Sequence, residues 1–132
     1  MRVNRRQEFV VCGYLPRARN FDSILVGYFD GRDLKFAGSV RAGFTTASRQ
    51  ALFVSLAKLE IAECPFTNLP DKSKGRWGTG ITAEKMAACR WLKPRIVVAI
   101  DFLEWTLDER LRHPAFVALS TEKLPKNVTR AG

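Results

Sequence analysis

Residues that could perform catalysis are sparse in this chain of 132 residues. The single histidine, His113, has no nucleophile near it in the sequence, and we interpret it as a structural hydrogen-bonding residue. Residues 75–80 (GRWGTG) look like a phosphate-cradling loop, but the Lys-Ser/Thr pair and the preceding strand that such a loop requires are missing. We therefore predict no catalytic residue in this chain.

Metal-ligating patterns are equally weak. Cys12, Cys64 and Cys89 are far apart and show no CxxC spacing, so we predict neither a zinc site nor a disulfide framework. Four acidic residues gather in one segment, where we interpret them as a solvated edge and not as a metal or acid–base site: Asp101, Glu104, Asp108 and Glu109. We expect no bound metal and no cofactor held by this chain alone.

Positive charge is the strongest compositional signal. The chain has 22 Lys and Arg residues against 13 Asp and Glu residues, a formal net charge of +9, and this excess favours a polyanionic partner. Trp77, next to Arg76, has the type and setting of a side chain that stacks on a nucleic-acid base. Trp91 and Trp105 stand beside strand-like aliphatic residues and are predicted to belong to the core. The alternative is that the basic residues are ordinary solvated side chains.

The elements that must position these residues are mainly strands. Aliphatic and aromatic runs predict strands at 8–15, 23–29, 34–40, 96–105 and 111–119, the last of them interrupted at Pro114. Residues 30–33 (DGRD) predict a hairpin turn. A helix capped by Thr45 or Thr46 and carrying Leu52, Leu56 and Leu59 on one face should end before Pro65, and a short second helix is expected at 82–88.

This order of elements has a known architecture. Five strands with one principal helix between the third and the fourth form an oligonucleotide-binding (OB) barrel, in which the helix plugs one end. We therefore predict a mainly β fold, with residues 1–132 forming a single OB domain. No apolar run approaches the roughly 18 residues that cross a membrane, and the amino terminus does not read as a signal peptide, so we expect a cytoplasmic protein with no membrane partner.

Several ordered motifs carry a family resemblance: QEFVVCGY, CPF, GRWGTGITAEKM, CRWLKP, FLEWT and LRHPAF. Together they resemble the carboxy-terminal OB domain of ATP-dependent DNA ligases, most closely the bacterial ligase D type of non-homologous end joining. The resemblance extends from about residue 6 to residue 123. It implies DNA ligase chemistry for a complete enzyme that uses ATP and Mg²⁺.

The resemblance also implies what this chain lacks. In the family, a nucleotidyltransferase domain carries the adenylated lysine in a Lys-x-Asp-Gly motif, whereas Asp30-Gly31 here has Tyr28 in the place of that lysine. We expect that domain to be absent from this sequence, to be needed in cis or in trans, and the chain alone to be inactive. The family's last motif, Arg-x-Asp-Lys, matches residues 120–123, where Glu122 and Lys123 are the nucleotide-associated positions and Ser120 replaces arginine.

The family's OB domain also grips nicked or broken duplex DNA during strand joining. The basic residues that we predict to contact phosphates are Arg5, Arg6, Arg17, Arg19, Arg41, Lys72, Lys74, Arg76 and Arg112. Two alternatives remain open. One is a free-standing OB module that binds single-stranded DNA or DNA ends without ligase activity, and the other is a protein-interaction module whose positive face meets an acidic partner.

Overall fold

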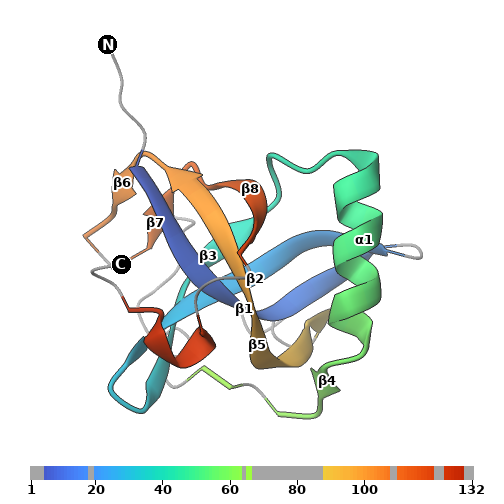
Figure 1. Cartoon of the computed structure of the whole chain (residues 1–132), viewed down its shortest axis with the longest axis horizontal. Helices are drawn as coiled ribbons and strands as arrows, with labels where there is room; N and C mark the ends of the chain where they lie inside the picture. The colour runs from blue at the N-terminus through green and yellow to red at the C-terminus, as the bar shows by residue number, and fades with distance from the viewer. Residues whose placement is uncertain are drawn as a thin grey trace.

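A computed structural model describes residues 5–17, 20–63, 65–66, 88–107, 110–120 and 124–129 (Figure 1). Three long strands come first: β1 (Arg5–Arg17), β2 (Asn20–Asp30) and β3 (Asp33–Val40). Helix α1 (Thr46–Ala57) and the short strand β4 (Glu60–Ile61) follow. The remaining elements are β5 (Arg90–Phe102), β6 (Glu104–Trp105), β7 (Leu111–Arg112), β8 (Ala115–Ser120) and the 3-10 helix η2 (Pro125–Asn127).

One curled antiparallel sheet makes up most of the fold. Its strand order is β3-β2-β1-β5-β4, with β8 also paired to β5, while β6 and β7 form a separate two-stranded sheet. Among the described residues, the outer edges of the curl meet at one isolated parallel bridge between Ala42, just after β3, and Ala115, at the start of β8. There the Phe116 amide donates to the Ala42 carbonyl over 2.9 Å. The predicted mainly β, OB-type architecture is confirmed, although the barrel is joined by a bridge instead of a full ladder.

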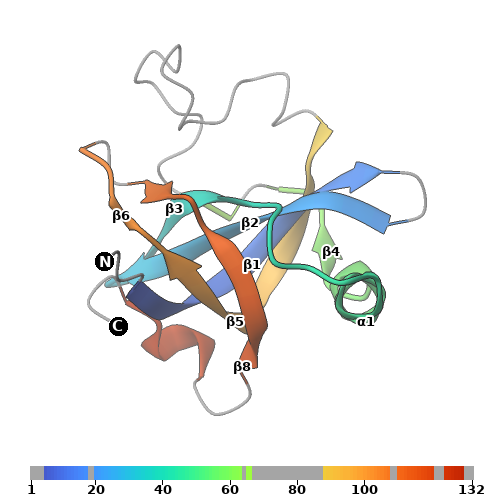
Figure 2. The same cartoon turned by 90° about the horizontal axis from the view of Figure 1, so that it is seen from above.

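The end of the barrel that holds α1 lies opposite the β6–β7 sheet (Figures 1 and 2). The Thr45 side chain caps the helix by accepting a hydrogen bond from the Ser48 amide, and the Ser48 hydroxyl in turn accepts one from the Thr45 amide. Leu52 and Leu56 of α1 are buried against the sheet, as the apolar spacing predicts. Leu59 was predicted to continue this helix, but it lies in the turn beyond Ala57 and is half-buried.

Aromatic side chains fill much of the core. The Trp105 ring makes edge contacts with Phe9, Tyr28 and Phe102, with ring centres 5.9, 5.7 and 5.7 Å apart. Trp91 is only 7% exposed. The prediction that both tryptophans belong to the core is confirmed for Trp91, while Trp105 is partly buried and packs against the core.

The fourth predicted strand begins earlier than expected, because Pro94 does not interrupt it. Strand β5 starts at Arg90, not at residue 96. In its register with β1, Ile96 faces Val11 and Trp91 faces Gly13, so residues 92–95 bulge opposite Cys12 alone. Proline lacks an amide hydrogen and is tolerated in a strand where no ladder bond is needed, which is the position that this bulge provides.

Other element boundaries also differ from the prediction. The expected strand 96–105 ends at Phe102, and Trp105 lies in β6, which pairs with β7. The expected last strand divides at His113 and Pro114 into β7 and β8, and His113 takes a positive φ of 53° in the exposed turn between them. Strand β4 was not predicted. Residues 82–87 of the predicted second helix lie outside the described residues, while Ala88 is helical. No helix in the described part is both long and apolar enough to cross a membrane.

Candidate nucleic-acid interface

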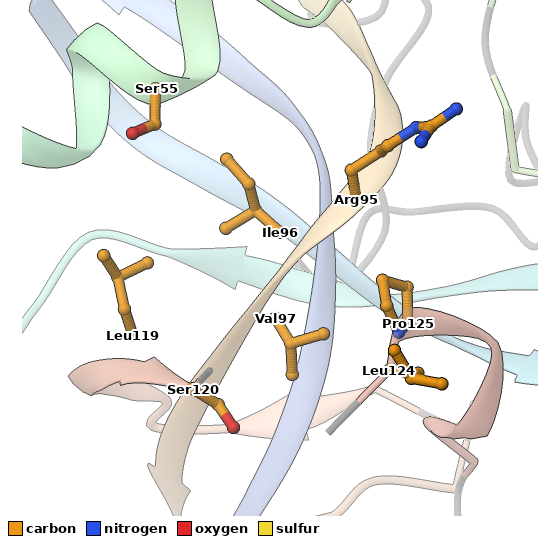
Figure 3. A pocket seen from close by; sticks show the side chains of 8 residues that line it. All are labelled: Ser55, Arg95, Ile96, Val97, Leu119, Ser120, Leu124 and Pro125. Carbon is orange, nitrogen blue, oxygen red and sulfur yellow. The ribbon is translucent and has the colours of Figure 1, made fainter. Parts of the chain in front are cut away.

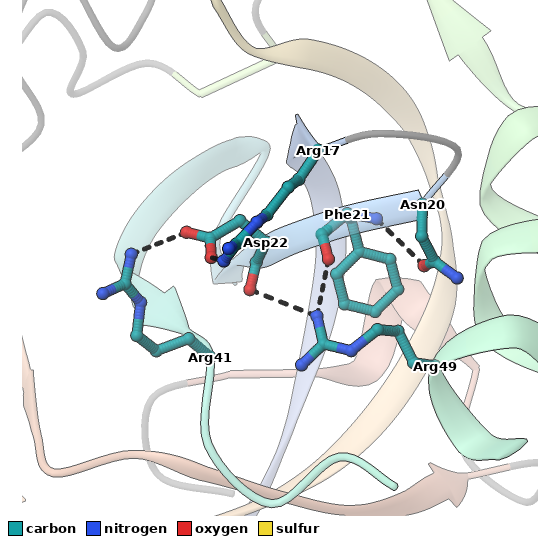
Figure 4. A network of polar contacts seen from close by, with 6 residues as sticks. All are labelled: Arg17, Asn20, Phe21, Asp22, Arg41 and Arg49. Atoms are coloured by element: carbon teal, nitrogen blue, oxygen red, sulfur yellow. Dashed lines mark hydrogen bonds and ion pairs between the residues drawn. The ribbon is translucent and has the colours of Figure 1, made fainter. Parts of the chain in front are cut away.

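Three arginines from different elements converge around Asp22 near the start of β2 (Figure 4). The Arg41 Nη2 lies 2.6 Å from the Asp22 Oδ2, and the Arg17 Nη1 lies 3.3 Å from the Oδ1. The Arg49 Nη1 donates to the carbonyl oxygen of Asp22 over 3.3 Å. We call Arg17, Asp22, Arg41 and Arg49 the Asp22 cluster.

The local fold brings these elements to one place. Arg17 ends β1 and pairs with Asn20 at the start of β2. Arg41 directly follows Val40, which pairs with Ile24 of β2. The Asn20 side chain accepts from the Phe21 amide over 2.9 Å and donates to Gln50 of α1 over 3.2 Å, so it connects β2 to the helix.

Arg49 is the most firmly held of the three guanidinium groups. Its Nη1 donates to the Phe21 carbonyl over 2.5 Å, and its Cζ lies 4.9 and 5.0 Å from the ring centres of Phe21 and Phe44. Stacking on aromatic faces and bonds to backbone oxygens fix the plane of an arginine without neutralising its charge. Sequence reasoning missed Arg49. One sequence feature could have identified it. Arg49 is a cation in the first turn of α1, where the helix dipole disfavours positive charge and where no acidic residue is present.

The cluster can exchange its internal partner for an external anion. It has three guanidinium groups and one carboxylate, a formal charge of +2. Its members Arg17, Asp22 and Arg49 line an open hollow of about 300 Å³ together with Asn20 and Phe21, whereas Arg41 is not part of that lining. The side chains of Arg17 and Arg41 are 77% and 72% exposed. Ion pairs at such exposure contribute only about 0–1 kcal/mol each, so a phosphate can compete for both arginines.

Arg6, at the other end of β1, is engaged within the sheet. Its Nε and Nη2 donate to the two carboxylate oxygens of Asp101 on β5, over 2.7 and 3.2 Å. The Arg6 hydrogen bond lowers the pKa of Asp101 below the ordinary 3.8, partly offset by desolvation and aided by the charge of Arg6. Glu104 of the same predicted acidic edge lies 3.3 Å from Arg112, so both carboxylates have an arginine partner while they stay accessible to solvent, with side chains 26% (Asp101) and 50% (Glu104) exposed.

The structure therefore divides the predicted DNA-contacting residues. Arg17 and Arg41 lie together in the Asp22 cluster, whereas Arg5 and Arg6 occupy the opposite end of β1 and Arg112 pairs with Glu104 on the small sheet. The remaining predicted site residues lie outside the described residues: Arg19, Lys72, Lys74, Arg76, Trp77, Glu122 and Lys123. Their predicted roles stay predictions.

A second hollow borders Ser120, the first residue of the predicted last motif (Figure 3). It has a volume of about 400 Å³, and most of its lining is apolar, with side chains from α1, β5, β8 and the start of η2. The Ser120 hydroxyl donates to the Glu8 carboxylate of β1. Leu119 and Leu124 beside it are 47% and 56% exposed, so the hollow presents an apolar surface next to this motif.

Metal-binding groups do not gather in the described part of the chain. Its His, Cys, Asp and Glu residues form no set of three that could hold an ion. Cys12 and Cys89 are buried in the core.

The curled sheet, the end-capping helix and the basic cluster define an OB-type domain with a candidate phosphate-binding surface. The chain belongs to the family of ATP-dependent DNA ligase C-terminal regions, whose family model matches residues 17–123. The family resemblance read from the sequence is confirmed.

The relatives within this family are multifunctional end-joining proteins. The LigD protein of Mycobacterium bovis is 32% identical over 129 residues, and that of Pseudomonas aeruginosa is 26% identical over 135 residues. These matches cover 94% and 98% of this chain but only 15% of each relative. The chain therefore spans about one seventh of the length of these curated relatives.

Solved ligase structures share the fold. The ligase domain of M. tuberculosis LigD matches with a TM-score of 0.82 and 28% identity, covering 96% of this chain and 39% of that one. A mycobacterial DNA ligase D complexed with ATP and MES matches with a TM-score of 0.76 and 30% identity, covering 96% of this chain and 38% of that one.

Proposed function

We propose that this chain is the DNA-binding OB domain of an ATP-dependent ligase and grips nicked or broken duplex DNA during strand joining. The observation that carries the proposal is the Asp22 cluster, which places three arginines from separate elements on one surface of a ligase C-terminal domain. Arginine forks suit phosphate oxygens, and phosphate contacts hold a duplex without reading its sequence. A nick can occur in any sequence, so such contacts fit the task.

The joining chemistry itself is assigned to a partner domain. Because no Lys-x-Asp-Gly motif is present, we propose that a nucleotidyltransferase domain, in cis or in trans, supplies the adenylated lysine and uses ATP and Mg²⁺. Ser120 cannot supply the bidentate contact to a nucleotide phosphate that an arginine would make. Its hydroxyl is already bonded to Glu8, and the apolar hollow beside it supports contact with another domain at this face.

A salt titration of DNA binding tests the proposal. Nicked duplex, intact duplex and single strand of equal length are compared between about 50 and 200 mM salt. We expect nicked duplex to bind best, and log affinity to fall with log salt with a slope of about −0.9 for each neutralised phosphate. About five contacts would give a slope of roughly −4.5.

A matched pair of double variants locates the contacts. Replacing Arg17 and Arg41 by alanine should weaken nicked-duplex binding and make the slope shallower by up to about 1.8. Replacing Arg32 and Lys35 of the β2–β3 hairpin by alanine removes the same charge at the far end of β2. This control should change the nicked-duplex affinity and the salt slope much less. Equal effects would mean that overall charge, and not the cluster, drives binding.

The other outcomes point to the alternative functions. A preference for single strand would favour an OB module that binds without ligation. Absence of binding at low salt would contradict the proposal and favour an acidic protein partner for the positive surface.

A further inference from the structure

We propose that Asp22 is an internal competitor for phosphate: its carboxylate occupies the place between Arg17 and Arg41 that a DNA phosphate takes on binding, and it limits the affinity of this surface. For DNA as the ligand, the inference rests on the function proposed above. The site itself is defined by the phosphate group, whatever molecule carries it.

The Asp22 carboxylate lies between two arginines. Each oxygen of Asp22 faces a different arginine, with Oδ1 next to Arg17 and Oδ2 next to Arg41 (Figure 4). This is a bridging anion between two guanidinium groups from separate elements. A phosphate presents at least two oxygens that can form the same pair of charge-assisted bonds.

The two arginines are far more exposed to solvent than their carboxylate partner. Arg17 and Arg41 are each more than 70% exposed, whereas the Asp22 side chain is 26% exposed. Both guanidinium groups can therefore swing toward solvent without loss of packing. Asp22 belongs to β2, where its neighbour Phe21 pairs with Pro16 of β1, so the carboxylate itself is held close to the sheet.

A third positive charge, that of Arg49, lies beside Arg17 and Asp22. Arg49 is anchored by the carbonyl oxygens of Phe21 and Asp22 and by two aromatic rings, and within the described residues it forms no ion pair with a carboxylate. Its positive charge is therefore available to an anion that enters the hollow. An incoming phosphate meets attraction from Arg49 and repulsion from Asp22, and the second effect sets the limit on affinity.

Removing the negative charge tests the inference. In Asp22→Asn, the shape of the side chain is kept and the competing charge is lost. We expect nicked-duplex affinity to rise about tenfold, since one unit charge at contact range has an effect of that order, and the salt slope to steepen by about 0.9 or more. Asp30→Asn removes the same charge at the other end of β2 and should change affinity less than about twofold.

A second readout separates this inference from the proposed function. Inorganic phosphate is titrated at constant ionic strength while the side-chain Nε–H signals of Arg17 and Arg41 are followed by NMR. Asp22→Asn should bind phosphate more tightly than the native chain, and this gain should be much smaller when Arg17 and Arg41 are both alanine, because only the repulsion near Arg49 is then removed. Asp22→Ser provides the same loss of charge if the asparagine variant does not fold.

The outcomes are distinct. If the native chain binds nicked duplex but the Asp22 variants bind DNA and phosphate equally well or more weakly, Asp22 organises the arginines and the competitor role is overturned. If the native chain does not bind DNA while the variants gain phosphate affinity, the competitor role stands and the DNA function fails.

Discussion

Asp101 of β5 stands directly opposite Arg6 of β1 in the sheet register, and two hydrogen bonds of 2.7 and 3.2 Å join their side chains. This bidentate pair links two neighbouring strands near the end of the barrel that is remote from α1. An arginine that the sequence assigns to DNA contact is therefore also a cross-strand partner, and its removal has consequences for the sheet itself.

The pH dependence of this pair has a definite sign. Because Arg6 lowers the pKa of Asp101 in the folded state, the interaction contributes stability above pH 3.8 that is lost as pH falls through the lowered value. Arg6→Gln should raise the Asp101 pKa toward 3.8 and lower the free energy of unfolding above pH 3.8, and this deficit should disappear as the pH falls through the lowered pKa of the native chain. Carboxyl NMR titration measures this pKa. Arg5→Gln should leave it unchanged, and an equal shift in both variants would contradict the specific pairing.

The barrel closure near Ala42 depends on Gly43. Gly43 has a φ of 89°, and a Cβ at this position would lie 2.3 Å from the Phe116 carbonyl oxygen. We expect Gly43→Ala to lower the free energy of unfolding by about 2–4 kcal/mol, measured by urea denaturation. Gly31→Ala is the control, because Gly31 also has a positive φ of 65° but meets no atom within 4 Å, so only about 1 kcal/mol of backbone strain is expected. Equal losses would show that the close approach to Phe116 is unimportant.

Replacing Arg49 by lysine is expected to weaken both the stability of the fold and DNA binding. Lysine keeps the charge but loses the planar group that stacks between Phe21 and Phe44 and bonds to the Phe21 carbonyl. Arg49→Lys should lower the free energy of unfolding by about 1–2 kcal/mol and weaken nicked-duplex binding several-fold. Thermal unfolding and a binding isotherm measure the two effects. Arg32→Lys, in the exposed β2–β3 turn, should change neither.

Trp105 secures the small β6–β7 sheet to the barrel through its contacts with three rings. Trp105→Ala should lower the free energy of unfolding by about 2–4 kcal/mol in urea, because these edge contacts and the buried ring surface are both lost. Leu107→Ala, in the turn that follows, removes a fully exposed side chain and should have almost no effect. A loss below about 1 kcal/mol for Trp105→Ala would contradict its core role.

Local signals were sufficient for much of the fold. The first three strands, the 30–33 turn and the helix capped by Thr45 follow from apolar spacing, glycine and a capping hydroxyl, all of which act within a few residues. The start of β5 could not be predicted in this way. Proline normally ends a regular element, and Pro94 is tolerated because residues 92–95 bulge away from their register with β1 opposite Cys12, a relationship between distant segments.

In the candidate site, too, residue types could be predicted from the sequence, whereas contacts between distant segments could not. The choice of Arg17 and Arg41 rested on charge and on the family resemblance, but their meeting at Asp22 depends on strand register. The partner of Arg6 is 95 residues away in the sequence, so this ion pair had no local signature. Arg112 pairs with Glu104 because the two residues face each other across the short strands β6 and β7, whose pairing was not predicted. Arg49 had only its unusual place in the first helical turn, and the rings of Phe21 and Phe44 that explain it come from other elements.

The central position of β1 has a consequence for synthesis on the ribosome. The first strand to emerge is flanked by β2 on one side and by β5 on the other, and β5 ends at Phe102. The meander of β1, β2 and β3 can form early, but the second edge of β1, along the buried residues Phe9 and Val11, lacks its partner β5 until some sixty further residues have been translated. We therefore expect the nascent domain to expose apolar strand surface for most of its translation and to depend on chaperones during that interval.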